Sequence, residues 1–240
     1  MPGPIVIAGA GQAGLQVAES LRHEGFQGVI TLLGDEAYGP YNRPPLSKKW
    51  LQERPELSTL AIRGREFIER KQIDLRTGVR VAAIDRNACE VQLADGHRLP
   101  YEGLALCTGA ALRRLPLPGA DLAGVFGLKT IDDALAIAAA MDDCLARDLP
   151  LVVIGGVFIG LEVAATAIKR GLRVTVLEGL DRLMSRVVAP IVSEAAARVH
   201  RAHGVQLEFD VKIPELLGEA GRVRAVRLAD GREFPAGCVL

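Results

Sequence analysis

The chain has 240 residues, of which 29 are basic and 29 are acidic, so its formal net charge at pH 7 is zero. Apolar residues make up 49% of the sequence and aromatic residues 4%. This composition excludes a disordered chain and the basic surface of a nucleic-acid-binding protein. No apolar run reaches the roughly 18 residues of a membrane span, and the N-terminus lacks a signal-peptide pattern. We therefore expect a cytoplasmic protein that binds neither nucleic acid nor membrane.

The N-terminal residues have the pattern of a βαβ unit. Ile5–Ala8 predicts a strand, and Gly9-Ala10-Gly11-Gln12-Ala13-Gly14 follows it. The next stretch is amphipathic as far as Gly25, and Val29–Leu33 predicts a second strand. In such a motif the first glycine permits a tight turn, the second lets a diphosphate approach the backbone, and the third lets helix and strand pack closely. The motif predicts dinucleotide binding, with a purely structural glycine turn as the alternative.

A proline-rich segment follows, with the sequence Tyr41-Asn42-Arg43-Pro44-Pro45-Leu46-Ser47-Lys48. Its two prolines restrict the backbone, and Arg43 and Lys48 place a cation on either side of them. A stiff loop with two cations suits an anionic ligand or an electron-rich ring. By composition alone, a proline-rich surface loop is the simpler interpretation.

Short alternating strands come after this segment. Val79–Ile84 and Cys89–Leu93 predict strands of a β-meander, and Asp95-Gly96 predicts a hairpin turn within it. Leu104-Ala105-Leu106-Cys107 then predicts a buried strand that ends at Thr108-Gly109.

The same order of elements returns in the second half of the chain, where Gly155 stands 155 − 9 = 146 residues after Gly9. Between the copies, Ala110–Gly119 is predicted to connect them. Thr130 and Asp133 are predicted to cap a helix that extends to Leu145.

The second copy begins with a strand at Leu151–Ile154, a glycine turn at Gly155–Gly160, a helix to Arg170 and a strand at Val174–Leu177. Its meander is predicted to include Val205–Phe209 and Val223–Leu228, with the turn at Asp230-Gly231. Leu228 corresponds to Leu93 (228 − 93 = 135), which sets Leu240 against Ala105. We therefore expect a chain cut short about two residues into a core strand.

Acidic residues at the end of the second strand bind the ribose of a dinucleotide. Glu178 has this position in the second copy and favours NAD over NADP. Gly34 is its counterpart in the first copy (178 − 34 = 144), so the next residue, Asp35, is the candidate there, with a solvated loop acid as the alternative. Val157 replaces the middle glycine of the second motif. We expect it to weaken dinucleotide binding, and to strain the backbone if the position requires a positive φ.

The cysteines and histidines do not form a familiar redox or metal motif. Cys89, Cys107, Cys144 and Cys238 are far apart, and no Cys-x-x-Cys occurs, which argues against a redox disulfide and a zinc knuckle. A pair of histidines, His200 and His203, is three residues apart on a predicted helix. A solvated helix face is the favoured interpretation of this pair and a metal pair the alternative, so no metal site is predicted.

Five motifs together are distinctive: Gly9–Gly14, Arg43–Lys48, Leu106–Gly109, Leu115–Gly119, and Val153–Gly156 with Phe158–Ala165. In these motifs the chain resembles the N-terminal part of the FAD-dependent ferredoxin reductases that serve Rieske oxygenases and cytochrome P450 systems, within the pyridine nucleotide-disulphide oxidoreductase superfamily. The resemblance implies an α/β fold of two Rossmann-like βαβ units, each with a β-meander. It implies an FAD-binding domain at residues 1–115 and an NAD-binding domain at residues 116–240, with the last strand and a C-terminal interface domain missing.

The resemblance also implies a reaction, in which FAD takes a hydride from NADH and electrons pass singly to a ferredoxin-type iron–sulfur partner. Such a route needs no protein disulfide. Lys48 would polarise the flavin, and Glu162 would pair with Lys48 and guide the nicotinamide, so these two are the predicted catalytic residues. The predicted cofactor-binding residues are Gly9, Gly11, Ala13, Gly14, Asp35, Arg43, Lys48, Val81, Thr108, Gly109, Lys129, Gly155, Gly156, Gly160 and Glu178.

Individual roles follow from the same resemblance. Ala13 and Asp35 would contact the FAD phosphates and adenosine, and the backbone of Val81 would meet the adenine. Thr108 and Gly109 would close over the FAD. Lys129 stands where the family usually has an arginine. Two alternatives stay open: a non-catalytic remnant that binds nucleotide weakly, and a related flavin reductase with another electron acceptor.

Overall fold

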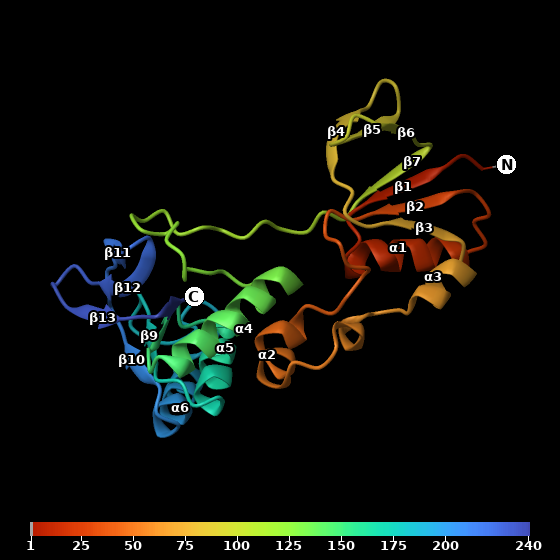
Figure 1. Cartoon of the computed structure of the whole chain (residues 1–240). Coiled ribbons are helices and arrows are strands. Elements are labelled where there is room, and N and C mark those ends of the chain that lie inside the picture. The colour runs from red at the N-terminus through yellow and green to blue at the C-terminus, as the bar shows by residue number, and fades with distance from the viewer. Residues whose placement is uncertain (1) are drawn as a thin grey trace. The chain divides into compact units, whose positions relative to one another are not determined.

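A computed structural model of the chain describes residues 2–240, which form two compact units (Figure 1). The first unit contains the residues up to Asn42 together with Glu56–Ala111, and the second contains Arg43–Pro55 and Leu112–Leu240. The predicted domains at residues 1–115 and 116–240 concern where each cofactor binds, and they stay a prediction.

The first unit is built on a four-stranded parallel sheet with the strand order β3-β2-β1-β7. Its strands are β1 (Ile5–Ala8), β2 (Ile30–Leu33), β3 (Ile73–Arg76) and β7 (Gly103–Leu106). Its helices are α1 (Gln12–His23), α3 (Arg65–Arg70) and the short 3-10 helix η2 (Leu57–Leu60). The predicted βαβ opening is confirmed, whereas β3 was not predicted.

Side chains of β1 alternate between the two faces of this sheet, as the period of a strand requires. Ile7 packs against Leu15 and Ala18 of α1. Val6 points to the other face and packs against Val91 and Leu93. Figure 1 shows the result, with α1 on one face of the sheet and a small meander on the other.

That meander is an antiparallel sheet of β4 (Val81–Asp85), β5 (Glu90–Leu93) and β6 (Arg98–Pro100). The Asp-Gly turn is confirmed: Gly96 has φ +89°, and the Leu93 amide donates to the His97 carbonyl at 2.8 Å. One expectation was wrong in part. β7 is a strand, but it lies at the edge of its sheet, and Leu106 is 63% exposed rather than buried.

The second unit repeats this plan with the parallel order β10-β9-β8-β14 and the antiparallel order β11-β12-β13. Its strands are β8 (Leu151–Ile154), β9 (Val174–Leu177), β10 (Gln206–Glu208), β11 (Glu215–Glu219), β12 (Arg222–Arg227), β13 (Glu233–Pro235) and β14 (Cys238–Val239). Its helices are η1 (Pro44–Ser47), α2 (Lys49–Glu53), α4 (Ile131–Ala146), α5 (Phe158–Lys169) and α6 (Pro190–Ala202). The predicted α/β fold with two Rossmann-like units is confirmed.

One strand of the second copy was assigned to the wrong sheet. Val205–Phe209 was expected in the meander, but β10 pairs in parallel with β9, with Leu207 opposite Val176. The meander instead begins at β11, which was not predicted. An alternating pattern gives the period of a strand but not the identity of its partner. The cap of α4 is confirmed, since Thr130 and Asp133 form a reciprocal capping box.

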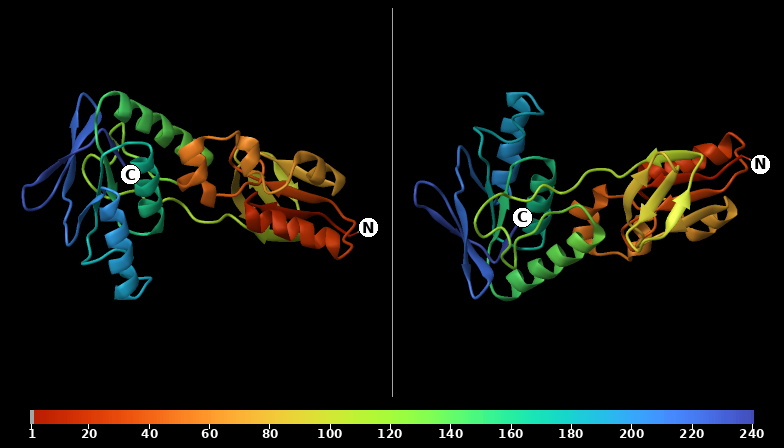
Figure 2. Two further views of the ribbon diagram at one scale, coloured as in Figure 1. Left: turned by 90° about the horizontal axis from the view of Figure 1, so that it is seen from below. Right: turned by 90° about the horizontal axis from the view of Figure 1, so that it is seen from above.

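The segment Arg43–Pro55 packs on α4 and α5, although it follows the first βαβ unit in the sequence (Figures 1 and 2). Leu46, Trp50 and Leu51 are buried. Arg54 binds Asp142 through two hydrogen bonds of 2.6 and 2.8 Å, and it also donates to the Ala138 carbonyl at 2.7 Å. A bidentate pair of this kind fixes geometry as well as charge. It anchors the segment at the end of α2.

None of the helices that residues 2–240 form has the length and apolar character that a membrane crossing requires.

Candidate functional site

The first glycine turn has two packed glycines and one open glycine. Gly9 has φ +115°, and a Cβ added to it would lie 2.1 Å from the Cys107 carbonyl oxygen. A Cβ on Gly14 would lie 2.0 Å from the Gly9 oxygen. A Cβ on Gly11 would meet no atom within 4 Å. Gly9 and Gly14 are therefore required by the fold, whereas Gly11 leaves free space in front of α1.

That space faces a helix N-terminus suited to anions. α1 begins after Gly11, which provides no side-chain cap, and its first turn contains no acidic residue. The first N–H groups of a helix have no partner within the helix and carry its positive dipole end. An incoming phosphate can therefore accept hydrogen bonds from the first turn, which includes Ala13.

The second turn differs at one position. Gly155 has φ +106°, and a Cβ on Gly160 would lie 2.3 Å from the Gly155 oxygen, as in the first copy. Val157 occupies the place of Gly11 as N-cap of α5, with φ −108° and ψ −177°. Valine adopts this extended conformation readily, so the conditional expectation of strain does not apply. Its side chain is 46% exposed and lies where the first copy is open.

The predicted alignment of the two second strands is confirmed by their hydrogen bonds. Gly9 donates to the Leu33 carbonyl and Gly155 to the Leu177 carbonyl, both at 2.8 Å. The residues that follow these two leucines, Gly34 and Glu178, are therefore structural counterparts.

The space between the glycine turn and the end of the second strand is filled by a different residue in each copy. In the first unit, a Cβ on Gly34 would lie 2.7 Å from the Ala10 methyl group. In the second unit, Gly156 stands in the place of Ala10, and the Glu178 carboxylate lies 3.2 Å from where a Cβ on Gly156 would be. The acid of the second copy thus has no room in the first, and Asp35, the exposed residue after Gly34, is the nearest alternative.

Glu178 is only 7% exposed, and both of its carboxylate oxygens accept backbone hydrogen bonds. Oε2 accepts from the Gly156 amide at 2.6 Å and Oε1 from the Leu180 amide at 2.9 Å. These bonds hold a buried charge in one orientation beside the second glycine turn.

Thr108 and Gly109 follow β7 next to the first glycine turn. The preceding residue, Cys107, donates to the Ala8 carbonyl at 2.7 Å, and Gly109 has φ +68°. Val81 begins β4 opposite Leu93. The predicted roles of Thr108, Gly109 and Val81 in FAD binding stay predictions.

A pocket of about 320 Å³ in the second unit brings four predicted residues together. They are Arg43, Lys48, Lys129 and Glu162. Arg43 also donates to the Lys129 carbonyl at 2.8 Å, which fixes its guanidinium near the pocket wall. Three cations and one carboxylate make the lining positive, an environment that favours an anionic or electron-rich group.

Lys48 and Glu162 form an ion pair in this pocket, as the resemblance implies. Lys48 Nζ lies 2.9 Å from Glu162 Oε1, and the two side chains are 51% and 27% exposed. The other oxygen of Glu162 accepts a hydrogen bond of 2.6 Å from Ser47 Oγ. Ser47 was not among the predicted site residues. The sequence shows Ser47 as the one hydroxyl in the string Pro44-Pro45-Leu46-Ser47-Lys48, but it does not show that this hydroxyl is buried.

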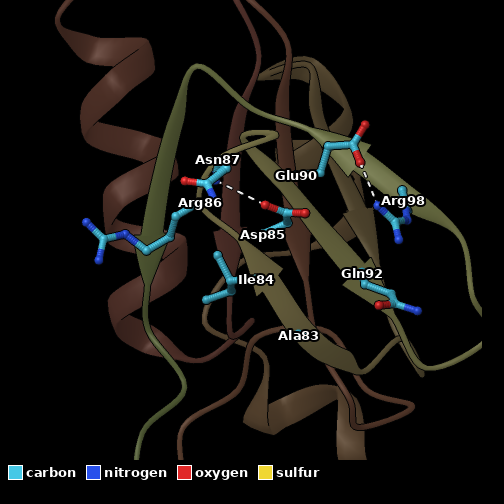
Figure 3. Close-up of a pocket in the computed structure, with 8 residues that line it drawn as sticks. All are labelled: Ala83, Ile84, Asp85, Arg86, Asn87, Glu90, Gln92 and Arg98. Atoms are coloured by element: carbon cyan, nitrogen blue, oxygen red, sulfur yellow. Dashed lines mark hydrogen bonds and ion pairs between the residues drawn. The ribbon is translucent and has the colours of Figure 1, made fainter.

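A second concavity lies on the meander of the first unit, and it contains none of the predicted site residues (Figure 3). Several of its polar groups bind one another: Asp85 accepts hydrogen bonds from the Asn87 and Ala88 amides at 3.0 Å, and Arg98 contacts Glu90 at 3.3 Å. The Ala88 and Asn87 hydrogen bonds hold the pKa of Asp85 below its usual value. These contacts shape a tight turn between β4 and β5.

The expectation of a solvated helix face holds for His203, which is exposed, whereas His200 is half-buried. Burial, and then His203, lower the pKa of His200 below its usual value. Among residues 2–240, no cluster of three or more His, Cys, Asp or Glu side chains has the arrangement of a metal site.

Comparison with known proteins identifies close relatives. The family model described as "Pyridine nucleotide-disulphide oxidoreductase" matches residues 3–240. The chain is 43% identical over 236 residues to rhodocoxin reductase of Rhodococcus erythropolis, covering 98% of this chain and 54% of that protein. It is 42% identical over 237 residues to the ferredoxin–NAD(+) reductase component of the p-cumate 2,3-dioxygenase system of Pseudomonas putida, covering 98% and 56%.

A solved structure gives the same result. The ferredoxin reductase for the CYP199A2 system from Rhodopseudomonas palustris superimposes with a TM-score of 0.92 at 40% identity, covering 98% of this chain and 57% of that one. The chain thus spans about half the length of the curated relatives that it matches.

Proposed function

The chain belongs to the pyridine nucleotide-disulphide oxidoreductase family. From that premise we propose that it acts as an NADH- and FAD-dependent oxidoreductase, which passes electrons to a ferredoxin-type iron–sulfur protein. The observation that carries the proposal is the presence, in one chain, of two glycine turns before helices without side-chain caps. Two such turns suit two dinucleotides.

The first unit fits FAD. The open space at Gly11 admits a diphosphate, and the first turn of α1 donates to it. Asp35 is the candidate acceptor for the adenosine ribose, because Ala10 occupies the space that an acid at residue 34 needs. When bound, FAD supplies the redox chemistry, because its ring accepts a hydride and releases single electrons.

The second unit fits NADH, although the Val157 side chain stands where the first unit has an open glycine. Glu178 presents a fixed carboxylate at the ribose position, which accepts hydrogen bonds from a 2′-hydroxyl and repels a 2′-phosphate. This charge supports the preference for NADH over NADPH. The side chain of Val157 narrows the approach of the diphosphate to the backbone.

The pocket in the second unit supports the proposed catalytic pair. Glu162 Oε1 lies 2.9 Å from Lys48 Nζ and holds the ammonium at the pocket. A fixed cation stabilises negative charge that develops on an electron-rich ring during reduction. Glu162 orients Lys48 and presents a carboxylate edge to the incoming nicotinamide.

The proposed partner rests on the relatives. One relative is named as a reductase of rhodocoxin and another as a ferredoxin reductase component, and both match 98% of this chain. We also propose a cytoplasmic location, supported by the four cysteines, which are all free thiols as in proteins from reducing compartments.

Four measurements on the purified 240-residue chain test the proposal. Added FAD should give a yellow protein that retains flavin absorbance, and FAD and NADH should each raise the melting temperature. NADH should bleach the flavin under anaerobic conditions, and a ferredoxin should then be reduced.

Each alternative predicts a different result. A colourless chain whose melting temperature ignores both cofactors matches the non-catalytic remnant. Flavin that is reduced by NADH and reoxidised by a quinone but not by a ferredoxin matches a reductase with another acceptor.

A further inference from the structure

Ser47 is a buried polar residue in an apolar surrounding. It is 4% exposed, and the nearby Leu46, Trp50 and Leu51 are buried to 3% exposure or less. Burying a hydroxyl costs free energy unless it is hydrogen bonded, and an alanine has no such cost. The packing of this segment therefore does not explain a serine at residue 47, and its hydrogen bonds must.

Those hydrogen bonds come from one face of α5. Ser47 Oγ donates to Glu162 Oε2 at 2.6 Å, and the Ser47 carbonyl accepts from Thr166 Oγ1 at 3.0 Å. Glu162 and Thr166 are four residues apart, which places them on the same side of the helix. The hydroxyl has only one other contact, with the Pro44 carbonyl at 3.4 Å, which is weaker. α5 thus holds the hydroxyl and the carbonyl of Ser47.

The contact matters because of what the other carboxylate oxygen does. Glu162 Oε1 lies 2.9 Å from Lys48 Nζ, and the Lys48 side chain is 51% exposed. A half-exposed ion pair is weak, since ordering two long side chains offsets most of the attraction. A carboxylate whose first oxygen is fixed by a short charge-assisted bond presents its second oxygen in one place.

From this geometry we infer that Ser47 is a positioning residue, which fixes Glu162 so that the Lys48 ammonium is held at one point of the pocket. The role of that ammonium in flavin reduction rests on the proposed function. The coupling from Ser47 through Glu162 to Lys48 is a property of the chain without any cofactor, so it can be measured separately.

Acylation of Lys48 measures the coupling. The experiment uses the full chain with Lys49→Arg, so that the modified amine is not the neighbouring lysine, and follows acetylation of Lys48 by peptide mass spectrometry. Ser47→Ala should raise the Lys48 rate about two- to fivefold, because an amine that is no longer held against the Glu162 carboxylate is more accessible to the acylating reagent. Glu162→Gln should raise the rate by at least as much.

The double variant decides whether Ser47 acts through Glu162. Once Glu162 is Gln, adding Ser47→Ala should leave the Lys48 rate unchanged, because coupled residues are not additive. Ser193→Ala is the matched control: Ser193 is also buried in the second unit, it donates at 2.6 Å to the Leu183 carbonyl, and it does not line the pocket. This control should leave Lys48 unchanged.

The inference is overturned if Ser47→Ala leaves the Lys48 rate unchanged, if it raises that rate equally when Glu162 is Gln, or if Ser193→Ala raises it as much. A second readout links the coupling to the proposed function. In the FAD-loaded chain, Ser47→Ala should slow flavin reduction at saturating NADH several-fold with the KM for NADH unchanged. A chain that never binds FAD refutes the proposed function, while the acylation cycle still decides the role of Ser47.

Discussion

Replacing Val157 with glycine tests how much one side chain limits the second dinucleotide site. The substitution recreates the open position of Gly11, where an added Cβ would meet nothing within 4 Å. Val157 already has an extended backbone, and glycine is a better N-cap than valine, so α5 should not lose stability. A change in NADH affinity therefore reflects the contact between the nucleotide and residue 157, and not a loss of helix stability.

The magnitude follows from the one phosphate–amide hydrogen bond that, on the proposed function, the Val157 side chain obstructs. A bond between a charged phosphate oxygen and an amide contributes about 1.5 to 3 kcal/mol. At about 1.4 kcal/mol for each factor of ten, recovering one such bond strengthens NADH binding by about 10- to 100-fold. Val157→Ala, which keeps Cβ and removes the two methyl groups, should give an intermediate affinity.

Titration calorimetry with NADH measures the effect, and the converse substitution in the first unit provides the matched comparison. Gly11 has φ −85° and ψ −169°, so Gly11→Val is tolerated by the backbone and should weaken FAD binding by at least tenfold. Equal NADH affinities for the wild type and Val157→Gly would refute the steric reasoning, as would normal FAD binding by Gly11→Val.

Three further outcomes are expected. Gly9→Ala should cost about 3 kcal/mol or more in urea unfolding, and Gly155→Ala about 1 to 2, because both glycines have positive φ but only Gly9 would collide with a carbonyl oxygen, at 2.1 Å; similar costs would contradict this. Hydrogen bonding from Arg54, assisted by Arg170, keeps the pKa of Asp142 below its usual value, so the pair stabilises the fold at neutral pH and is lost as the pH falls below about 4. Asp142→Asn should therefore lower the free energy of unfolding by about 0.5 to 1 kcal/mol at pH 7 and by progressively less as the pH falls below about 4, and a constant difference across this range would speak against the pair. Burial raises the pKa of Cys238 to about 12, so iodoacetamide at pH 8 should modify the exposed Cys89 and leave Cys238 intact until the chain is unfolded, as a thiol count by mass spectrometry will show.

Much of the fold was predictable because the sequence states it twice. The glycine turns, the helices behind them and the Asp-Gly hairpins are local patterns with fixed chemistry, and each appears at matching positions in both halves. What failed was the assignment of partners. β3 and β10 are short strands whose place in a parallel sheet depends on distant residues, and no local pattern distinguishes them from strands of a meander.

The candidate site also has a part that was predicted and a part that was missed. The pairing of Lys48 with Glu162 came from family resemblance, since no spacing rule joins two residues that are far apart in the chain. Ser47 was missed because its significance depends on burial: a serine in a proline-rich segment is ordinary on a surface and informative only in an apolar interior. The packing of Arg43–Pro55 on α4 and α5 likewise depends on Arg54 and Asp142, two charged residues that look like solvated surface in the sequence.

The two units differ at one pair of matching positions, which constrains how duplicated units of this kind can diverge. The first unit has Ala10 and Gly34 there, and the second has Gly156 and Glu178. A glutamate introduced at residue 34 alone would collide with a methyl group 2.7 Å away. Ala10→Gly removes that methyl group and makes room for the glutamate, whereas Gly34→Glu without it gives a variant with a steric clash. Converting the first nucleotide site into a copy of the second therefore requires Ala10→Gly together with Gly34→Glu, because the glutamate alone has no room.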